Sequence, residues 1–219
     1  IFKFYYQAWL LWGVAVAYGS AFLLQKLRSP WAYIFRLLLV TSIGVGIIYT
    51  VLGLLDKTNG FSPPSGWTLD SAAYYEQQAP DEMAAIHWLK TARDGVVAEA
   101  VSPTGGSYTN YGRVSKFSGL PAVLGWMGHE SQWRGGGREM GSRQSDIERL
   151  YCSRSWEETQ EILENYNIRY VFVGDLERST YLPNQGECRT GLYELKFRRY
   201  LNTTFEQGNV AIYEVPWIK

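Results

Sequence analysis

The chain has 219 residues, of which 46% are hydrophobic and 16% aromatic, and its 21 basic residues balance its 21 acidic residues. This composition excludes a disordered chain, and the zero net charge without a basic stripe excludes a general nucleic-acid-binding protein. The charge is unevenly distributed, because residues 1–55 contain four bases and no acid, whereas the remaining residues contain 17 bases and 21 acids. The sequence therefore predicts a membrane segment joined to a mildly acidic globular domain. Because the first residue is Ile rather than Met, we expect this chain to be the C-terminal piece of a longer protein.

Two long apolar stretches open the chain, and neither carries an acidic residue. Phe4 to Leu24 is uncharged, and a second stretch covers residues 31–55. A helix needs about 20 apolar residues to cross the hydrocarbon core of a bilayer. The alternative is a pair of buried helices in a soluble protein, but such helices normally have a polar face, which these stretches lack. The sequence predicts two membrane-spanning helices, over 4–24 and 31–55, with the lipid bilayer as their partner.

The charges of the short connection between the two stretches predict the orientation. Lys26 and Arg28 lie in this connection, and the side chain of Arg36 can reach back toward them. Basic loops remain on the cytoplasmic side of a membrane. We therefore expect an integral membrane protein in which everything from Asp56 onward is extracytoplasmic.

The remaining residues predict a linker over 56–80 and one α/β domain over 81–219. Gly, Pro and Ser are frequent in the linker, and Ser155 followed by Glu158 is typical of a helix capping box. Strands that alternate with helices and end in a hairpin indicate an α/β domain with a mixed sheet. We expect helices over 81–92 and 155–165, strands over 96–101, 122–126 and 168–173, and a hairpin over 203–206 and 210–215.

The chain has two cysteines, Cys152 and Cys188, both in the globular part. An oxidising extracytoplasmic compartment would permit a disulfide between them, whereas two isolated cysteines do not require one. The paired short spacings of a structural zinc site are absent. Both the disulfide and the free thiols stay open at this point.

The segment from Gly125 to Gly137 is the most unusual in the sequence, because it places His129, Glu130, Trp133 and Arg134 directly after a predicted strand. Open α/β sheets bind ligands at the carboxyl ends of their strands. An indole, a carboxylate and a guanidinium there could bind a sugar or a phosphate. The alternative is a structural loop in which Glu130 pairs with Arg134 and Trp133 fills the core. A zinc protease is excluded, because its second histidine would be at position 133.

A carboxylate and a Gly-rich aromatic segment precede this stretch. Glu99 interrupts an apolar run, and a buried carboxylate requires a partner such as Arg113 or Arg134, or belongs to a site. The segment over 105–119 contains Tyr111 and Arg113 but lacks the spacing of phosphate-binding and dinucleotide-binding loops.

Several motifs together resemble a known family of polytopic membrane proteins from archaea and Chloroflexi-type bacteria, the Chlor_Arch_YYY family. The most specific of them is G-H-E-S-Q-W-R-G at Gly128 to Gly135. Others are F-K-F-Y-Y-Q-A-W-L-L at 2–11, Y-G-R-V-S at 111–115, G-L-P-A-V-L-G-W at 119–126 and Y-V-F-V-G-D-L-E-R at 170–178. The match covers the last two membrane spans and the C-terminal domain of that family.

This resemblance implies a part of a GT-C glycosyltransferase-like protein that takes sugar from a polyprenyl-phosphate donor for a glycan or protein acceptor. The catalytic carboxylate of such enzymes lies in an early loop outside this chain, so the fragment alone should be inactive and no catalytic residue is assigned here. No cofactor is expected in the fragment, and a divalent metal in the full-length protein stays open. The expected substrate-binding residues are Glu99, Tyr111, Arg113, His129, Glu130, Trp133 and Arg134.

Two other functions stay open. One is a non-enzymatic, membrane-anchored module for binding or assembly outside the cytoplasm, which the aromatic content permits. The other is a metal hydrolase, which would depend on Glu99, His129 and Glu130.

Overall fold

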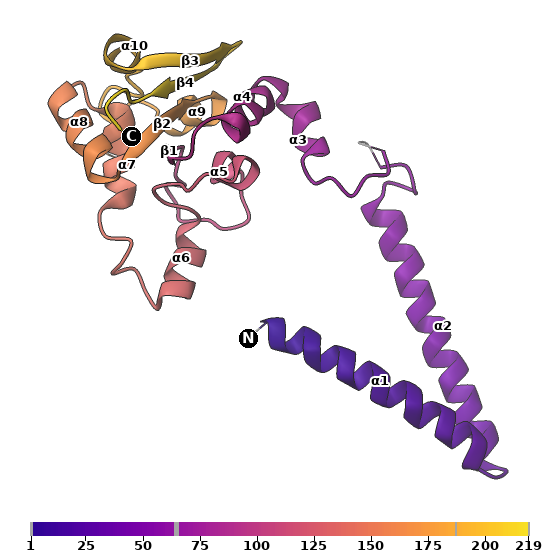
Figure 1. Ribbon diagram of the computed structural model, residues 1–219. Coiled ribbons are helices and arrows are strands. Elements are labelled where there is room, and N and C mark those ends of the chain that lie inside the picture. The colour runs from indigo at the N-terminus through magenta and orange to yellow at the C-terminus, as the bar shows by residue number, and fades with distance from the viewer. Residues whose placement is uncertain (1, 64–65, 187, 219) are drawn as a thin grey trace. The chain divides into compact units, whose positions relative to one another are not determined.

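The computed structural model describes residues 2–63, 66–186 and 188–218, and the chain divides into two compact units, Ile1–Trp67 and Thr68–Lys219 (Figure 1). The first unit contains helix α1 (Phe2–Lys26) and helix α2 (Trp31–Lys57). Both helices are long and apolar enough to cross a membrane, and no apolar residue is buried within 4–26 of α1 or within α2. Because a core helix of a soluble domain would be buried, this exposure indicates membrane anchoring.

A mixed four-stranded sheet forms the centre of the second unit. Its order is β1 (Val96–Ala98), β2 (Ile168–Val173), β4 (Val210–Glu214) and β3 (Asn202–Gln207). β1 and β2 are parallel, whereas β4 is antiparallel to both of its neighbours. The expected fold class, two apolar helices followed by an α/β domain with a mixed sheet, is confirmed.

Helices cover both faces of this sheet, which explains why every residue of β2 is buried. Tyr170 and Phe172 pack with one hydrophobic cluster, whereas Val171 and Val173 pack with the other, as the alternation of a strand requires. The first face is covered by α3 (Ala73–Gln78), α4 (Pro80–Thr91) and α5 (Arg113–Ser118). The second is covered by α7 (Arg143–Cys152), α8 (Trp156–Asn165), α9 (Asp175–Thr180) and α10 (Leu195–Tyr200).

Two expected strands differ from the structure. The strand over 96–101 ends at Ala98, because the side chain of Glu99 turns to bind the backbone of α5. The prediction of a strand over 122–126 is wrong, because in this segment only Ala122 pairs, in one isolated bridge with Val97. Because β1 has only three residues, it is too short to pair with the whole segment 122–126. The chain then enters helix α6 (Met127–Arg134), so the segment expected to be a loop is largely helical.

The helix that begins after Ser155 is confirmed, but its cap is only half of the expected capping box. Ser155 Oγ accepts a hydrogen bond from the backbone N–H of Glu158 at 3.1 Å. The backbone N–H of Ser155 instead donates to Ser153 Oγ, and the carboxylate of Glu158 accepts from Arg149. A disulfide joins Cys152, at the end of α7, to Cys188, with their Cα atoms 5.0 Å apart.

Candidate functional site

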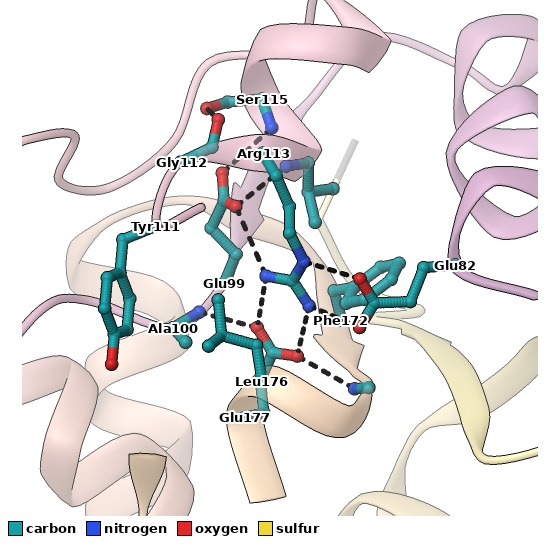
Figure 2. A network of polar contacts seen from close by, with 12 residues as sticks. Glu82, Glu99, Ala100, Tyr111, Gly112, Arg113, Ser115, Phe172, Leu176 and Glu177 are labelled. Atoms are coloured by element: carbon teal, nitrogen blue, oxygen red, sulfur yellow. Dashed lines mark hydrogen bonds and ion pairs between the residues drawn. The ribbon is translucent and has the colours of Figure 1, made fainter. Parts of the chain in front are cut away.

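The parallel strands β1 and β2 bring two carboxylates to the same edge of the sheet. Glu99 directly follows β1, and Glu177 belongs to α9, which is separated from β2 by Gly174 alone. The guanidinium of Arg113, from the first residue of α5, lies between them and Glu82 of α4 (Figure 2). This is the carboxyl edge of the parallel strand pair, where open α/β sheets place their sites.

Arg113 uses its whole guanidinium in this cluster. Nε and Nη2 donate to the two carboxylate oxygens of Glu82 at 2.6 and 2.8 Å. Nη2 and Nη1 donate to the two oxygens of Glu177 at 2.9 and 3.2 Å. Such paired hydrogen bonds fix both distance and orientation, because the guanidinium matches a carboxylate edge to edge. The side chain of Arg113 is 1% exposed, so the cluster is separated from solvent.

Glu99 completes the cluster and holds the start of α5. Its two oxygens accept the backbone N–H groups of Val114 and Ser115, both at 2.8 Å, and Oε2 lies 3.9 Å from Nη1 of Arg113. Of the two partners considered for Glu99, Arg113 is therefore the one that the fold supplies. Glu99 therefore binds the backbone N–H groups at the start of α5.

Burial and the charge of Arg113 act on the three ionisable groups in different ways. Burial raises the pKa of Glu99, and the charge of Arg113 only partly opposes this. For Glu82 burial is the largest single influence and acts in the same direction, but the hydrogen bonds and charge of Arg113, together with hydrogen bonds from Tyr75 and the backbone of Asp175, outweigh it and lower the pKa. Burial disfavours the charged form of Arg113, yet the charge of Glu177 and hydrogen bonds to Glu82 raise its pKa overall. The Arg113–Glu82 pair is therefore ionised at neutral pH.

A second group of predicted residues lies on α6, beside an aromatic cluster. The rings of Tyr108, Trp126 and His129 contact one another, with centroids 4.8 Å apart for Tyr108–His129 and 5.3 Å apart for Trp126–His129. Nδ1 of His129 is buried and has no hydrogen-bond partner among the described residues. A buried polar atom without a partner is costly, so a ligand that supplied one would be favoured.

Four of the predicted residues line one cavity next to this cluster. The cavity has a volume of about 320 Å³ and is lined by Trp126, His129, Glu130, Trp133 and Arg134. A neighbouring cavity of about 390 Å³ shares Trp126 and Glu130 with it and is also lined by Gly112, Ser115 and Lys116 of the α5 region. Together the linings of the two cavities offer aromatic faces, a carboxylate and a guanidinium.

The alternative interpretation of this segment as a purely structural loop agrees with the geometry in one respect only. Glu130 and Arg134 do pair, with Nε and Oε2 2.5 Å apart, one helical turn from each other. Trp133, however, is 73% exposed and does not fill the core. Its indole instead lies at the surface and lines the cavity.

Tyr111 connects the two groups of residues. Its backbone carbonyl accepts a hydrogen bond from Nε1 of Trp126, and its hydroxyl lies 3.1 Å from Oγ1 of Thr180 in α9. The seven predicted residues thus form a buried set, Glu99 and Arg113, and a cavity set on α6, with Tyr111 between them.

Four contributing residues were missed by sequence reasoning: Glu82, Tyr108, Trp126 and Glu177. The signal for Glu177 was its place one turn after the buried strand 168–173, where an acid can bind free N–H groups; it accepts from Gly174. Nothing local marked Glu82 as the partner of Arg113. Among the described residues, no group of three or more His, Cys, Asp or Glu side chains could hold a metal ion.

No protein-family model and no curated protein matches this chain. Among solved structures, it is similar to the crystal structure of the C-terminal globular domain of an oligosaccharyltransferase from Archaeoglobus fulgidus. The identity is 16%, the TM-score is 0.38, and the match covers 62% of this chain and 96% of that one. At this identity and TM-score, the likeness establishes neither a shared fold nor a shared activity.

Proposed function

We propose that this chain is the C-terminal part of a membrane glycosyltransferase-like protein of the GT-C type, and that its globular domain binds a sugar-bearing substrate beside α6. The observation that carries the proposal is the cavity lined by Trp126, His129, Glu130, Trp133 and Arg134. Aromatic faces pack against the C–H face of a sugar ring, and a carboxylate accepts hydrogen bonds from its hydroxyls. The two apolar helices and the sequence resemblance support membrane attachment of this binding domain.

The substrate we propose is a polyprenyl-phosphate-linked sugar or the acceptor glycan. Arg134 is the group suited to a phosphate, since a guanidinium pairs with its oxygens. Its present partners, Glu130 and Glu139, leave it half exposed and able to exchange one ion pair for another. The basic connection between α1 and α2 favours an extracytoplasmic position for the domain.

Glu99 and Arg113 take a positioning role in this proposal. They hold the N-terminal turn of α5, and the neighbouring residues Ser115 and Lys116 line the cavity that shares Trp126 with the α6 site. The chemistry of transfer is assigned to a carboxylate outside this chain, so this part assists binding.

The test is sugar transfer from polyprenyl-phosphate donors by membranes that contain the longer protein. Trp133→Ala and Glu130→Ala should each reduce transfer at least tenfold, mainly by raising the KM for the sugar substrate. Trp67→Ala is the matched control, because Trp67 is equally exposed, at 71%, and lines neither cavity. Unchanged transfer in both folded variants would make α6 structural, and transfer by no donor would favour a non-enzymatic binding module.

A further inference from the structure

A second cavity, of about 620 Å³, lies between the start of α8 and α10 and shares no lining residue with the α6 cavities. This volume is in the range of small-molecule sites, about 300–1,000 Å³. Its charge is strongly one-sided, because its lining includes a single acid, Glu157, and the bases Arg154, Lys196, Arg198 and Arg199.

Two of these bases have no acidic partner within the part of the chain that the structure describes. Arg198 pairs with Glu194 and Glu206. Arg154 and Arg199, by contrast, form no ion pair with any residue that the structure describes. Both are exposed at the surface. An unpaired guanidinium at the rim of a cavity is available for a carboxylate, sulfate or phosphate group.

Aromatic rings hold these two guanidinium groups and form a wall of the cavity. The guanidinium of Arg154 lies over Tyr193, 5.5 Å from the ring centroid, and that of Arg199 lies 5.3 Å from the centroid of Tyr200. Tyr200 stacks on Trp156 at 4.3 Å with an interplanar angle of 18°. Stacking leaves the N–H edges of the guanidinium groups free to donate. Basic groups and a flat apolar surface are therefore presented side by side.

Three covalent or hydrogen-bonded links fix the two sides of this cavity relative to each other. The disulfide Cys152–Cys188 ties the end of α7 to the segment before α10. The backbone N–H of Tyr193 donates to the carbonyl of Tyr151 at 2.9 Å. Nζ of Lys196 donates to the carbonyl of Ser153 at 2.6 Å. A site fixed in this way loses little conformational entropy when a ligand binds.

Lys196 adds a donor at the base of the cavity. Its side chain is buried, and its ammonium has one hydrogen-bond acceptor, Ser153, among the described residues. Burial lowers the pKa of Lys196 to about 7, and the charge of Glu158 opposes this only in part. An anion bound nearby would favour the protonated form and gain from it.

We propose that this cavity, which we call the α8–α10 pocket (Arg154, Trp156, Tyr193, Lys196, Arg199 and Tyr200), binds a sugar ring that carries an oxyanion. Arg154 and Arg199 bind the anionic group, the Trp156–Tyr200 wall packs against the ring, and Glu157 accepts from a hydroxyl. Carboxylate, sulfate and phosphate share the chemistry that the guanidinium groups recognise. This site is separate from the α6 cavity, and its test measures binding rather than transfer.

The test is calorimetric binding to the full chain in detergent micelles, with glucuronate and glucose 1-phosphate as the anionic probes. At least one of them should bind, and Arg154→Gln and Arg199→Gln should each weaken that binding at least tenfold. Both side chains are exposed and form no ion pair with a described residue, so these variants should keep the fold. Arg93→Gln is the matched control, since Arg93 is also exposed and does not line the pocket.

The choice between the two probes identifies the source of the anionic group, and preference for either supports the proposal. Glucose tests the sugar ring without the anionic group, whereas acetate and inorganic phosphate test the anionic group without the ring. Each of the three should bind at least tenfold more weakly than the better anionic sugar. Inorganic phosphate or acetate binding as tightly as the sugar would overturn the sugar part of the proposal. Absence of binding to both probes, or equal binding by the parent and the Arg154 and Arg199 variants, would overturn it altogether.

Discussion

Arg113 and Glu82 form two parallel hydrogen bonds, of 2.6 and 2.8 Å, although 31 residues separate them in the chain. The contact joins α4 to α5, whose residues Ser115 and Lys116 line one of the cavities next to α6, and Glu177 anchors the same guanidinium to α9. One buried cation therefore connects three helices on the edge of the sheet.

Removal of this cation should be strongly destabilising. Arg113→Met leaves the carboxylates of Glu82, Glu99 and Glu177 buried together without a counter-charge. Loss of one partner of a buried ion pair costs about 3–5 kcal/mol. We expect a loss of this size in the free energy of unfolding, measured by near-UV circular dichroism in denaturant. Arg138→Met, at an exposed position, should change it by less than about 0.5 kcal/mol; a similarly small effect at Arg113 would contradict the role of the cluster.

Glu82 should make stability depend on acidic pH in a defined direction. Because Arg113 lowers the pKa of Glu82, its contribution is complete above the ordinary Glu value of 4.5 and is lost as the pH falls through the lowered value. Glu82→Gln should therefore be less stable than the parent at pH 7, and the difference should shrink below pH 4.5. Unfolding curves of both proteins between pH 3 and 7 measure this difference. A gap that stays constant over the range would show that Glu82 acts through packing alone.

The disulfide should stabilise the globular domain by restricting its unfolded state. Cys152 and Cys188 are 36 residues apart, and closing a loop of that length is worth about 3–4 kcal/mol in the chain-entropy model. Replacing both cysteines with serine should lower the free energy of unfolding by about this amount. A reducing agent should do the same to the parent and leave the double variant unchanged. Equal stability of the parent and its reduced form would contradict this prediction.

The regular elements of this fold follow from local patterns in the sequence. The apolar run over 168–173 predicts a buried strand, and the observed β2 covers the same residues. Pro80 and the following acids predict the start of α4. These elements are set by short-range rules of burial and helix capping, which act within a few residues.

The site could be predicted only in part. The α6 residues are neighbours in the sequence, whereas the residues that surround Arg113 are distant from it in the sequence. The sequence Gly125 to Gly137 marks α6 through its unusual composition, and four of its side chains do line one cavity. The partners of Arg113, in contrast, come from positions 31 and 64 residues away. No local signal marks such pairs, since their contact depends on how the sheet aligns distant segments of the chain.

Lys196 should make stability rise with pH above neutrality. Burial lowers its pKa from 10.5 to about 7, so between these values the unfolded chain binds a proton that the folded protein does not. Stability rises with pH wherever the unfolded state binds more protons. The parent should therefore gain about 2 kcal/mol between pH 7 and 9 from this group, and Lys196→Met should lack this gain.

The measurement is denaturant unfolding of both proteins at intervals from pH 7 to 9, in a buffer free of anionic sugars. The window stops at pH 9 because burial raises the pKa of Tyr151 and Tyr181, and these groups reduce stability as the pH passes their ordinary value of 10. Lys90→Met, at an exposed position of α4, controls for the loss of a lysine and should keep the slope of the parent. Parallel pH profiles for the parent and Lys196→Met would show that Lys196 remains charged in the folded protein. An anion bound in the α8–α10 pocket would then gain nothing from a change in the protonation of Lys196.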